Sequence, residues 1–385
     1  MIEKLQNSTR FRTVRQQAPR KRQKSEDHNM KEFKTIGILT SGGDAPGMNA
    51  AVRAVTRTAL ARGISVKGIY NGYAGLIAGG DEIKPLGMRD VSNIINRGGT
   101  ILYSARCLEF KTPEGQMKAV ETCKKEGIDG IVAIGGDGTF RGAMALSARG
   151  IPCIGLPGTI DNDITATQKT IGYDTAMNTV IEMVDKLRDT SESHERCSVV
   201  EVMGRDAGDI ALNSALASGA TGVAIPEQPF DEKALFRKMA NSRKLGKRNF
   251  IIIVSEGMGK DFGQNLSDKI ERELGIESRF TRLGHVVRGG SPTVGDRVMA
   301  TQMGVYAVEE LLKGHSNLVI CERHGRICGM DIHHALILDR MYKNKLEEGD
   351  LDGFSAEELV GMRADAEEKR STIKMLYEIE NEINV

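Results

Sequence analysis

The sequence predicts a doubly wound α/β fold built on mostly parallel sheets. From Thr35 onwards, short β-branched runs alternate with helical stretches, which is typical of βαβ units. Several of these runs are apolar at every position, as expected for strands that are covered on both faces of a parallel sheet. Many end in a polar turn that contains glycine. Because ligands bind at the carboxyl ends of such strands, these turns are candidates for one common site.

Seven runs carry the strand pattern, and the first is followed by a helix rich in Ala and Val that starts near Met48. The runs are residues 36–39, 66–70, 130–134, 153–156, 198–202, 250–254 and 318–321. After about residue 343 the sequence becomes rich in Glu and Lys. Four residues there lie near helical spacing: Ile373, Leu376, Glu380 and Ile383. This spacing predicts a terminal amphipathic helix that packs on the body or on a neighbouring subunit, with a regulatory role as the alternative.

Composition restricts the function classes. The chain has 385 residues, enough for two or three domains, and its 53 basic and 52 acidic residues give a net charge of +1. No overall field therefore attracts nucleic acid or a membrane surface. The longest apolar runs are far shorter than the ~18 residues that a membrane span needs. Six scattered cysteines without CxxC spacing indicate reduced thiols rather than a zinc site, so we expect a cytoplasmic protein.

The first 29 residues differ from the rest, because they hold eight Lys/Arg against three acids and almost no apolar periodicity. We expect residues 1–30 to form a disordered basic extension. A nucleic-acid or targeting arm is one interpretation. We favour an upstream extension without such a role, since Met30 opens a stretch that resembles a natural start.

Residues 42–47 form the first glycine-bearing turn, which joins a strand to the helix near Met48. Glycines let backbone N–H groups approach a phosphate, and a helix N-terminus adds partial positive charge. The segment is neither a Walker A motif nor GxGxxG. It predicts a phosphate cradle, with a purely structural turn as the alternative.

Two later turns carry carboxylates. Asp137 lies among glycines in residues 135–139, which leaves room for a triphosphate and offers Mg²⁺ one protein oxygen. Asp161 and Asp163 are two residues apart, so both side chains point the same way in an extended segment. A hydroxyl that attacks phosphorus needs a proton acceptor, and we predict Asp161 for this role. An Asx turn or a helix cap is the alternative.

Five arginines are candidates for binding phosphate: Arg106, Arg196, Arg205, Arg279 and Arg288. A planar guanidinium matches phosphate oxygens and supplies the charge that phosphoryl transfer requires. Taken singly, each is more often a solvated surface charge, and the nearby His285 a packed histidine.

Five motifs together resemble the 6-phosphofructokinase family in order and spacing, across about residues 34–340. They are residues 39–51, 134–138, 157–163, 202–205 and 283–292. The resemblance implies two doubly wound, mostly parallel-sheet domains with the active site in the cleft between them. The larger, ATP-binding domain comprises residues 31–171 plus about 284–334, the smaller, sugar-phosphate-binding domain residues 172–283, and residues 335–385 a C-terminal helical segment.

The family's roles transfer position by position. The resemblance implies ATP binding by Gly43, Arg106, Cys107, Gly136, Asp137, Gly138 and Thr139, with Asp137 on Mg²⁺. It implies fructose 6-phosphate binding by Thr159, Ile160, Asp161, Asp163, Met203, Gly204, Arg205, Glu256, His285 and Arg288, joined by Arg196 and Arg279 from a neighbouring subunit. The catalytic set is Asp161, Arg205, Arg106 and Thr159. A homotetramer with shared active sites follows from the resemblance, with no membrane partner and no nucleic acid expected.

The phosphoryl donor is predicted from two positions. Pyrophosphate-using relatives typically carry Asp and Lys where this chain has Gly138 and Gly158. A carboxylate at the first position would repel and crowd a nucleotide, so the glycines favour ATP. Tagatose 6-phosphate as the acceptor and a nucleotide-sensing protein without turnover stay open as alternatives. The family's usual aromatic residue after Arg106 is replaced by Cys107, and a usual Gln by Val287.

A regulatory site is predicted less directly. Arg53, Arg57, Arg188 and Lys247 match basic positions of the bacterial effector site, and the first two share one helix face. Met88 and Thr221 depart from that pattern. Activation by a nucleoside diphosphate or inhibition by phosphoenolpyruvate is one interpretation, and a solvated basic face is the other.

Overall fold

The computed structural model describes residues 33–384. The predicted basic extension, residues 1–30, lies outside the described residues. Within residues 33–384, no helix is both long and apolar enough to cross a membrane.

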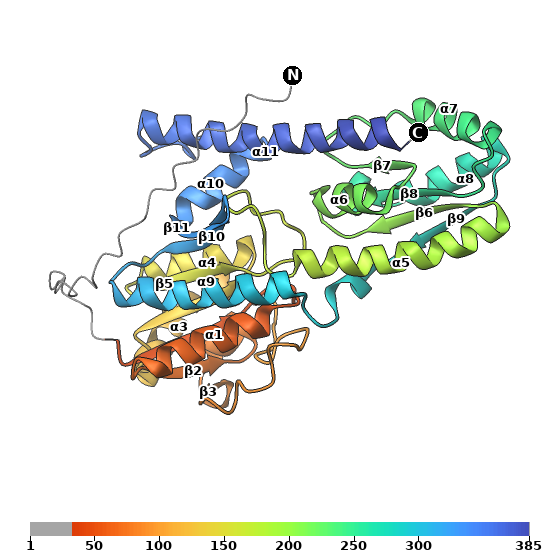
Figure 1. The fold of residues 1–385 in the computed structure, drawn as a ribbon. Coiled ribbons are helices and arrows are strands. Elements are labelled where there is room, and N and C mark those ends of the chain that lie inside the picture. Colours follow the sequence, from red (N-terminus) through yellow and green to blue (C-terminus); the bar gives the residue numbers. More distant parts are fainter. Residues whose placement is uncertain (1–32, 385) are drawn as a thin grey trace, which may run out of the picture. The chain divides into compact units, whose positions relative to one another are not determined.

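The first sheet has seven strands in the order β11-β10-β5-β4-β1-β2-β3 (Figure 1). Its five inner strands are parallel, and the edge strands β3 and β11 run antiparallel to their neighbours. The strand bounds are β1 Thr35–Thr40, β2 Ser65–Ile69, β3 Ile83–Pro85, β4 Gly130–Gly135, β5 Cys153–Pro157, β10 Leu318–Arg323 and β11 Arg326–Asp331.

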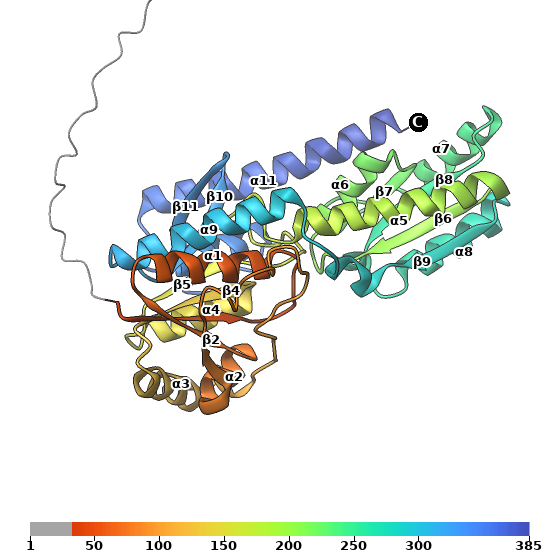
Figure 2. The ribbon, with the colours of Figure 1, turned by 60° about the horizontal axis from the view of Figure 1, so that its bottom comes forward.

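Helices cover both faces of this sheet. They are α1 Met48–Ala61, α2 Gly72–Ala78, α3 Pro113–Glu126, α4 Asp137–Ser147, α9 Val294–Leu312 and α10 Ile332–Tyr342. Successive residues of β1 enter different cores: Ile38 packs with residues of α1 and α9, and Leu39 packs with residues of α2, α3 and α4. Figure 2 shows α1 and α9 together on one side and α2 and α3 on the other. The central strands β4 and β5 carry no polar side chain because both of their faces are buried.

The second sheet is fully parallel, with four strands in the order β7-β8-β6-β9. Its strands are β6 Cys197–Val202, β7 Gly222–Ala224, β8 Phe250–Ser255 and β9 Ser278–Arg282. Its helices are α5 Tyr173–His194, α6 Asp209–Ser218, α7 Glu232–Lys244 and α8 Phe262–Leu274. Val199, Ile252 and Phe250 belong to a separate core cluster that includes residues of α7 and α8.

The last helix, α11 Ala356–Ile383, contacts a helix beside the first sheet and both a helix and a strand of the second sheet's region. It begins at a capping box in which Ser355 and Glu358 bond each other's backbone, a strong signal for a helix N-terminus. It packs on α10 near its start and on α6 and β7 further along (Figures 1 and 2). Ile373 is buried as the helical spacing predicts, whereas Ile383 is exposed.

All seven predicted strands form, each within one or two residues of the predicted bounds. Four strands were missed: β3, β7, β9 and β11. β3 and β7 have only three residues each, and β9 (SRFTR) and β11 (RICGMD) are polar. All four lie at sheet edges. β9 and β11 are partly exposed there and so lack a continuous apolar run, whereas β7 is buried and was missed because it is short.

Candidate active site

Three glycine-bearing turns meet at the carboxyl ends of β1, β4 and β5, which are neighbours in the first sheet. Together with two arginines they enclose a cavity of about 130 Å³. Its lining comprises Ser41, Gly42, Gly43, Gly136, Asp137, Gly138, Thr139, Gly158, Thr159, Asp161, Arg205 and Arg288. The structure therefore brings together lining residues from Ser41 to Arg288, which are far apart in the chain, at the edge where parallel sheets bind ligands.

The first turn is held closely against its neighbours. Gly42 has φ 86°, a left-handed conformation that favours glycine, and its carbonyl accepts a bond of 2.6 Å from Ser104 Oγ. A Cβ at Gly43 would lie 2.1 Å from Arg288 Nη1. Glycine at this position therefore lets the Arg288 guanidinium lie directly against the turn.

Asp137 begins α4 and lines the cavity with a side chain that is 17 % exposed. Burial, with repulsion from the carboxylates of Asp339 and Asp163, raises the pKa of Asp137 to about 6, although Lys343 and Arg141 oppose the shift. A Cβ at the adjoining Gly138 would meet nothing within 4 Å, so open space adjoins this carboxylate.

These features fit Mg²⁺. Residues 33–384 contain no group of three or more His, Cys, Asp or Glu arranged to hold a metal. A cation here would take one carboxylate oxygen from Asp137 and complete its shell with phosphate oxygens and water, as Mg²⁺ does in many nucleotide sites. A bound cation would also stabilise the charged form of the Asp137 carboxylate, which Asp339 and Asp163 repel.

Asp161 is almost fully buried, with 1 % of the residue exposed. Its Oδ2 lies 3.2 Å from Arg205 Nε, and its Oδ1 has no hydrogen-bond partner. Burial raises the pKa of Asp161 to about 6, helped by Asp163 and opposed by Arg205 and Arg288. An unpartnered buried oxygen with a raised pKa is a good acceptor for a proton delivered by a ligand.

Arg205 reaches the cavity from an irregular turn after β6. Gly204 has φ 147° and Arg205 φ 54°. Both backbone N–H groups donate to Glu256 Oε1, at 3.1 and 2.8 Å, so this carboxylate holds the turn. Arg205 Nη1 also lies 3.7 Å from Asp163 Oδ2. Arg205 therefore spans both aspartates of the third turn.

Other predicted residues differ in exposure. Arg106 and His285 are exposed, and Thr159 is buried with its Oγ1 accepting a bond of 3.2 Å from the Asp161 amide. Ile160 is fully buried in the hydrophobic core, so only its backbone can meet a ligand. Cys107 packs partly against the core beside α2 and α3.

Arg196 and Arg279 are not part of this cluster within one chain. Both pair with Glu277, Arg196 Nε at 2.8 Å. They lie at the amino ends of β6 and β9, whereas Arg205 and Arg288 follow the carboxyl ends of these strands. β6 has six residues, so with about 3.3 Å per residue its two ends are roughly 17 Å apart.

The predicted effector residues form two groups. Arg188 lowers the pKa of Lys247, although burial is the larger cause, and Lys238 adds to the effect. Arg53 and Arg57 are half-buried on α1, beside the first sheet. No hydrogen bond or ion pair within residues 33–384 joins the two groups.

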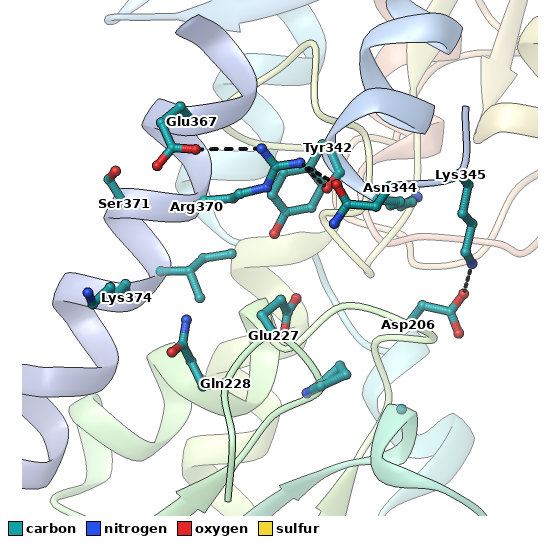
Figure 3. A pocket seen from close by; sticks show the side chains of 14 residues that line it. Asp206, Glu227, Gln228, Tyr342, Asn344, Lys345, Glu367, Arg370, Ser371 and Lys374 are labelled. Carbon is teal, nitrogen blue, oxygen red and sulfur yellow. Dashed lines mark hydrogen bonds and ion pairs between the residues drawn. The ribbon is translucent and has the colours of Figure 1, made fainter. Parts of the chain in front are cut away.

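A wider cavity of about 570 Å³ lies outside the predicted site, between α11, the end of α10 and residues 226–228. Figure 3 shows Tyr342, Glu227 and Arg370 around it. Tyr342 Oη and Glu227 Oε2 are buried without a hydrogen-bond partner. No sequence pattern predicted this cavity.

The sequence and fold match known phosphofructokinases. The family model described as "Phosphofructokinase" matches residues 35–311. The chain is 53 % identical over 316 residues to ATP-dependent 6-phosphofructokinase 1 of Clostridium perfringens, covering 82 % of this chain and 98 % of that protein. It is 52 % identical to the ATP-dependent 6-phosphofructokinase of Bacillus subtilis, covering 79 % and 94 %.

Among solved structures, phosphofructokinase from Saccharomyces cerevisiae aligns with a TM-score of 0.79 at 33 % identity, covering 90 % of this chain. The chain spans 49 % of the length of that yeast chain. Residues 35–311, which match the family model, include the whole four-stranded sheet and the three turns that line the cavity. The chain belongs to the phosphofructokinase family.

Proposed function

We propose that the chain is an ATP-dependent 6-phosphofructokinase. It transfers the γ-phosphoryl group of ATP to the 1-hydroxyl of fructose 6-phosphate and releases fructose 1,6-bisphosphate and ADP. The observation that carries this proposal is the buried Asp161 with its unpartnered Oδ1, held beside Arg205 at the edge of a glycine-lined cavity. The names of the bacterial relatives support the same reaction.

In this reaction Asp161 accepts the proton of the attacking hydroxyl, while Thr159 lies beside it. Arg205 and Arg106 stabilise the negative charge on the transferring phosphoryl group. Asp137 would hold Mg²⁺, which when bound neutralises phosphate charge. Backbone N–H groups of Gly43, Gly136 and Gly138, with Thr139 and Cys107 nearby, bind the nucleotide.

The sugar phosphate binds Asp163, Met203, Gly204 and Glu256 through its sugar, and His285 and Arg288 through its 6-phosphate. Arg196 and Arg279 complete this site from a neighbouring subunit of a homotetramer. Their position about one strand length from Arg205 supports a shared site, since they are too distant to serve the cavity of their own chain.

The domain assignment follows the two sheets. We propose residues 31–171 plus about 284–334 as the ATP-binding domain and residues 172–283 as the sugar-phosphate domain, with residues 335–385 as a C-terminal helical segment. The strands of the four-stranded sheet all fall within 172–283. The enzyme is proposed to be cytoplasmic.

Two features bear on specificity and regulation. The open space at Gly138 supports ATP over pyrophosphate, and Gly158 is crowded by Ile134 and Met48, each 3.0 Å from an added Cβ. Arg53, Arg57, Arg188 and Lys247 are proposed to bind an anionic effector. Arg188 is close enough to Lys247 to lower its pKa, which supports an anion site at these two residues.

Initial rates with Mg²⁺ test the function, comparing ATP with pyrophosphate and fructose 6-phosphate with tagatose 6-phosphate. We expect turnover with ATP and fructose 6-phosphate. Activity only with pyrophosphate would contradict the argument from Gly138. No turnover with any pair, in protein that binds nucleotide, would favour a nucleotide sensor.

A further inference from the structure

Asn162 lies between Asp161 and Asp163 in a backbone conformation that needs support. Its φ is 52° although it is not glycine, and it is buried. Asparagine tolerates this left-handed conformation better than most residues, and its contacts decide how firmly it is held. The side chain is fixed on both ends: Oδ1 accepts from the Thr170 amide at 3.0 Å, and Nδ2 donates to Asp209 Oδ1 at 3.0 Å.

Two lysines hold the backbone of the same loop. Lys369 Nζ donates to the Asn162 carbonyl at 3.0 Å, and Lys343 Nζ donates to the Asp163 carbonyl at 3.1 Å. Both side chains are largely buried, at 16 % and 18 % exposure. Hydrogen bonds from a charged donor are stronger than neutral ones, particularly away from water.

The two lysines come from the last two helices of the chain. Lys343 follows α10, and Lys369 lies on α11 next to Arg370. Arg370 Nη2 donates to the carbonyls of Met341 and Tyr342, at 2.8 Å each. It also bonds Asn344, which lies beside it in Figure 3. α11 is thus anchored to the end of α10 at the residue beside Lys369. Both helices lie beyond residues 35–311, which match the family model.

We propose that Lys369 is a positioning residue that acts on Asp161 through the Asn162 peptide. The inference rests on the proposed role of Asp161 as the proton acceptor. Asp161 and Asn162 are adjacent, so a rotation of the strained Asn162 backbone would move the Asp161 carboxylate. Lys369 opposes this rotation because its ammonium holds the carbonyl, while its 3.9 Å separation from Asp209 Oδ2 keeps it close to the loop. The C-terminal helix thereby becomes part of the catalytic machinery without touching a substrate.

The test is Lys369→Met, which retains length and apolar packing and removes the charged donor. We expect kcat to fall roughly 10- to 100-fold, as for a displacement of a reacting group by about 1 Å, while KM for both substrates changes less than about threefold. Lys369→Arg should recover part of the loss. Lys374→Met is the matched control, because Lys374 lies on the same helix, is 66 % exposed and pairs only weakly with Glu378 at 3.9 Å.

Combination with Asp161→Asn separates positioning from general structural support. If Lys369 acts through Asp161, Lys369→Met should reduce the residual turnover of the Asp161→Asn enzyme by less than about twofold. A full 10- to 100-fold further loss would overturn the proposal, and so would unchanged kcat in the single variant. Lys369→Gln, which retains a neutral donor, replaces the Met variant in both measurements if that variant does not fold.

The same measurements distinguish failure of the underlying function. Full turnover by Asp161→Asn would show that Asp161 is not the base, whatever Lys369 does. A large loss in Asp161→Asn together with normal turnover in Lys369→Met would leave the proposed function intact and remove only the positioning role.

Discussion

Replacing Asp161 by asparagine should stabilise the fold while abolishing most turnover. The pKa of Asp161 is raised from 3.8 to about 6 by burial and by Asp163. A folded pKa above the unfolded value means that the folded state binds the proton more tightly, so stability falls as pH rises from about 4 to 6 and stays lower above that. The difference of about 2 pKa units corresponds to about 3 kcal/mol at pH 7. Asparagine removes this cost because it carries no charge.

Thermal unfolding at pH 7 and near pH 4 measures the effect. For a chain of this size, about 3 kcal/mol raises the midpoint by about 4 °C, and the difference between the variant and the wild type should shrink towards pH 4. Turnover should fall by about 10²- to 10⁴-fold. Asp206→Asn is the control, because Lys345 lowers the pKa of that exposed carboxylate and its removal should not stabilise the fold. An Asp161→Asn protein no more stable than the wild type at pH 7 would refute the reasoning.

Four further outcomes are expected. The kcat/KM of the wild type should rise with pH through about 6 as Asp161 of the free enzyme loses its proton, and a flat profile from pH 5 to 8 would contradict its role as base. Gly43→Ala should raise the KM for fructose 6-phosphate, because its Cβ would meet Arg288 Nη1 at 2.1 Å and displace the guanidinium proposed to bind the 6-phosphate; an unchanged KM would contradict the need for Arg288 to lie against this turn. Asp137→Asn should raise the Mg²⁺ concentration for half-maximal rate, measured by titration at fixed ATP. Arg279→Ala should weaken sugar-phosphate affinity, and mixing its chains with Asp161→Asn chains should restore some activity; no recovery despite subunit exchange would contradict shared sites.

The cavity lined by the three glycine-bearing turns was predictable from the sequence, because each turn is a short continuous segment with its own pattern. Asp137 and Asp161 each lie in the turn that follows an apolar run, and in a parallel sheet the carboxyl ends of neighbouring strands meet at one edge. The apolar runs do not reveal the strand order β5-β4-β1. The three turns converge because these three strands are neighbours in a parallel sheet, in whichever order they lie. The open space at Gly138 agrees with the sequence argument for the donor, whereas the approach of the Arg288 guanidinium to Gly43 was not predicted.

The support of the site was not predictable, because it depends on contacts distant in sequence. Lys369 meets the Asn162 carbonyl 207 residues away, and in the sequence it is one lysine of a Glu/Lys-rich helix. The left-handed backbone of Asn162 has no pattern in residue type beyond the tolerance of asparagine for that conformation. Asp339 and Lys343, four residues apart and paired at 2.7 Å, are a local pair within this network that the sequence analysis did not use.

The charge balance of the site explains why so much support is needed. Asp137 and Asp161 both have raised pKa values from burial, and Asp163 repels each of them. Arg205 and Lys343 offset this repulsion, Arg205 at Asp161 and Lys343 at Asp137. A loop with buried, mutually repelling carboxylates tends to open towards water, since charged groups lose hydration on burial. Lysine donors on the carbonyls of Asn162 and Asp163 oppose that opening and leave Asp161 Oδ1 without a partner, free to receive a proton. Hydrogen bonds from lysine to main-chain oxygen therefore suit this site better than further ion pairs would.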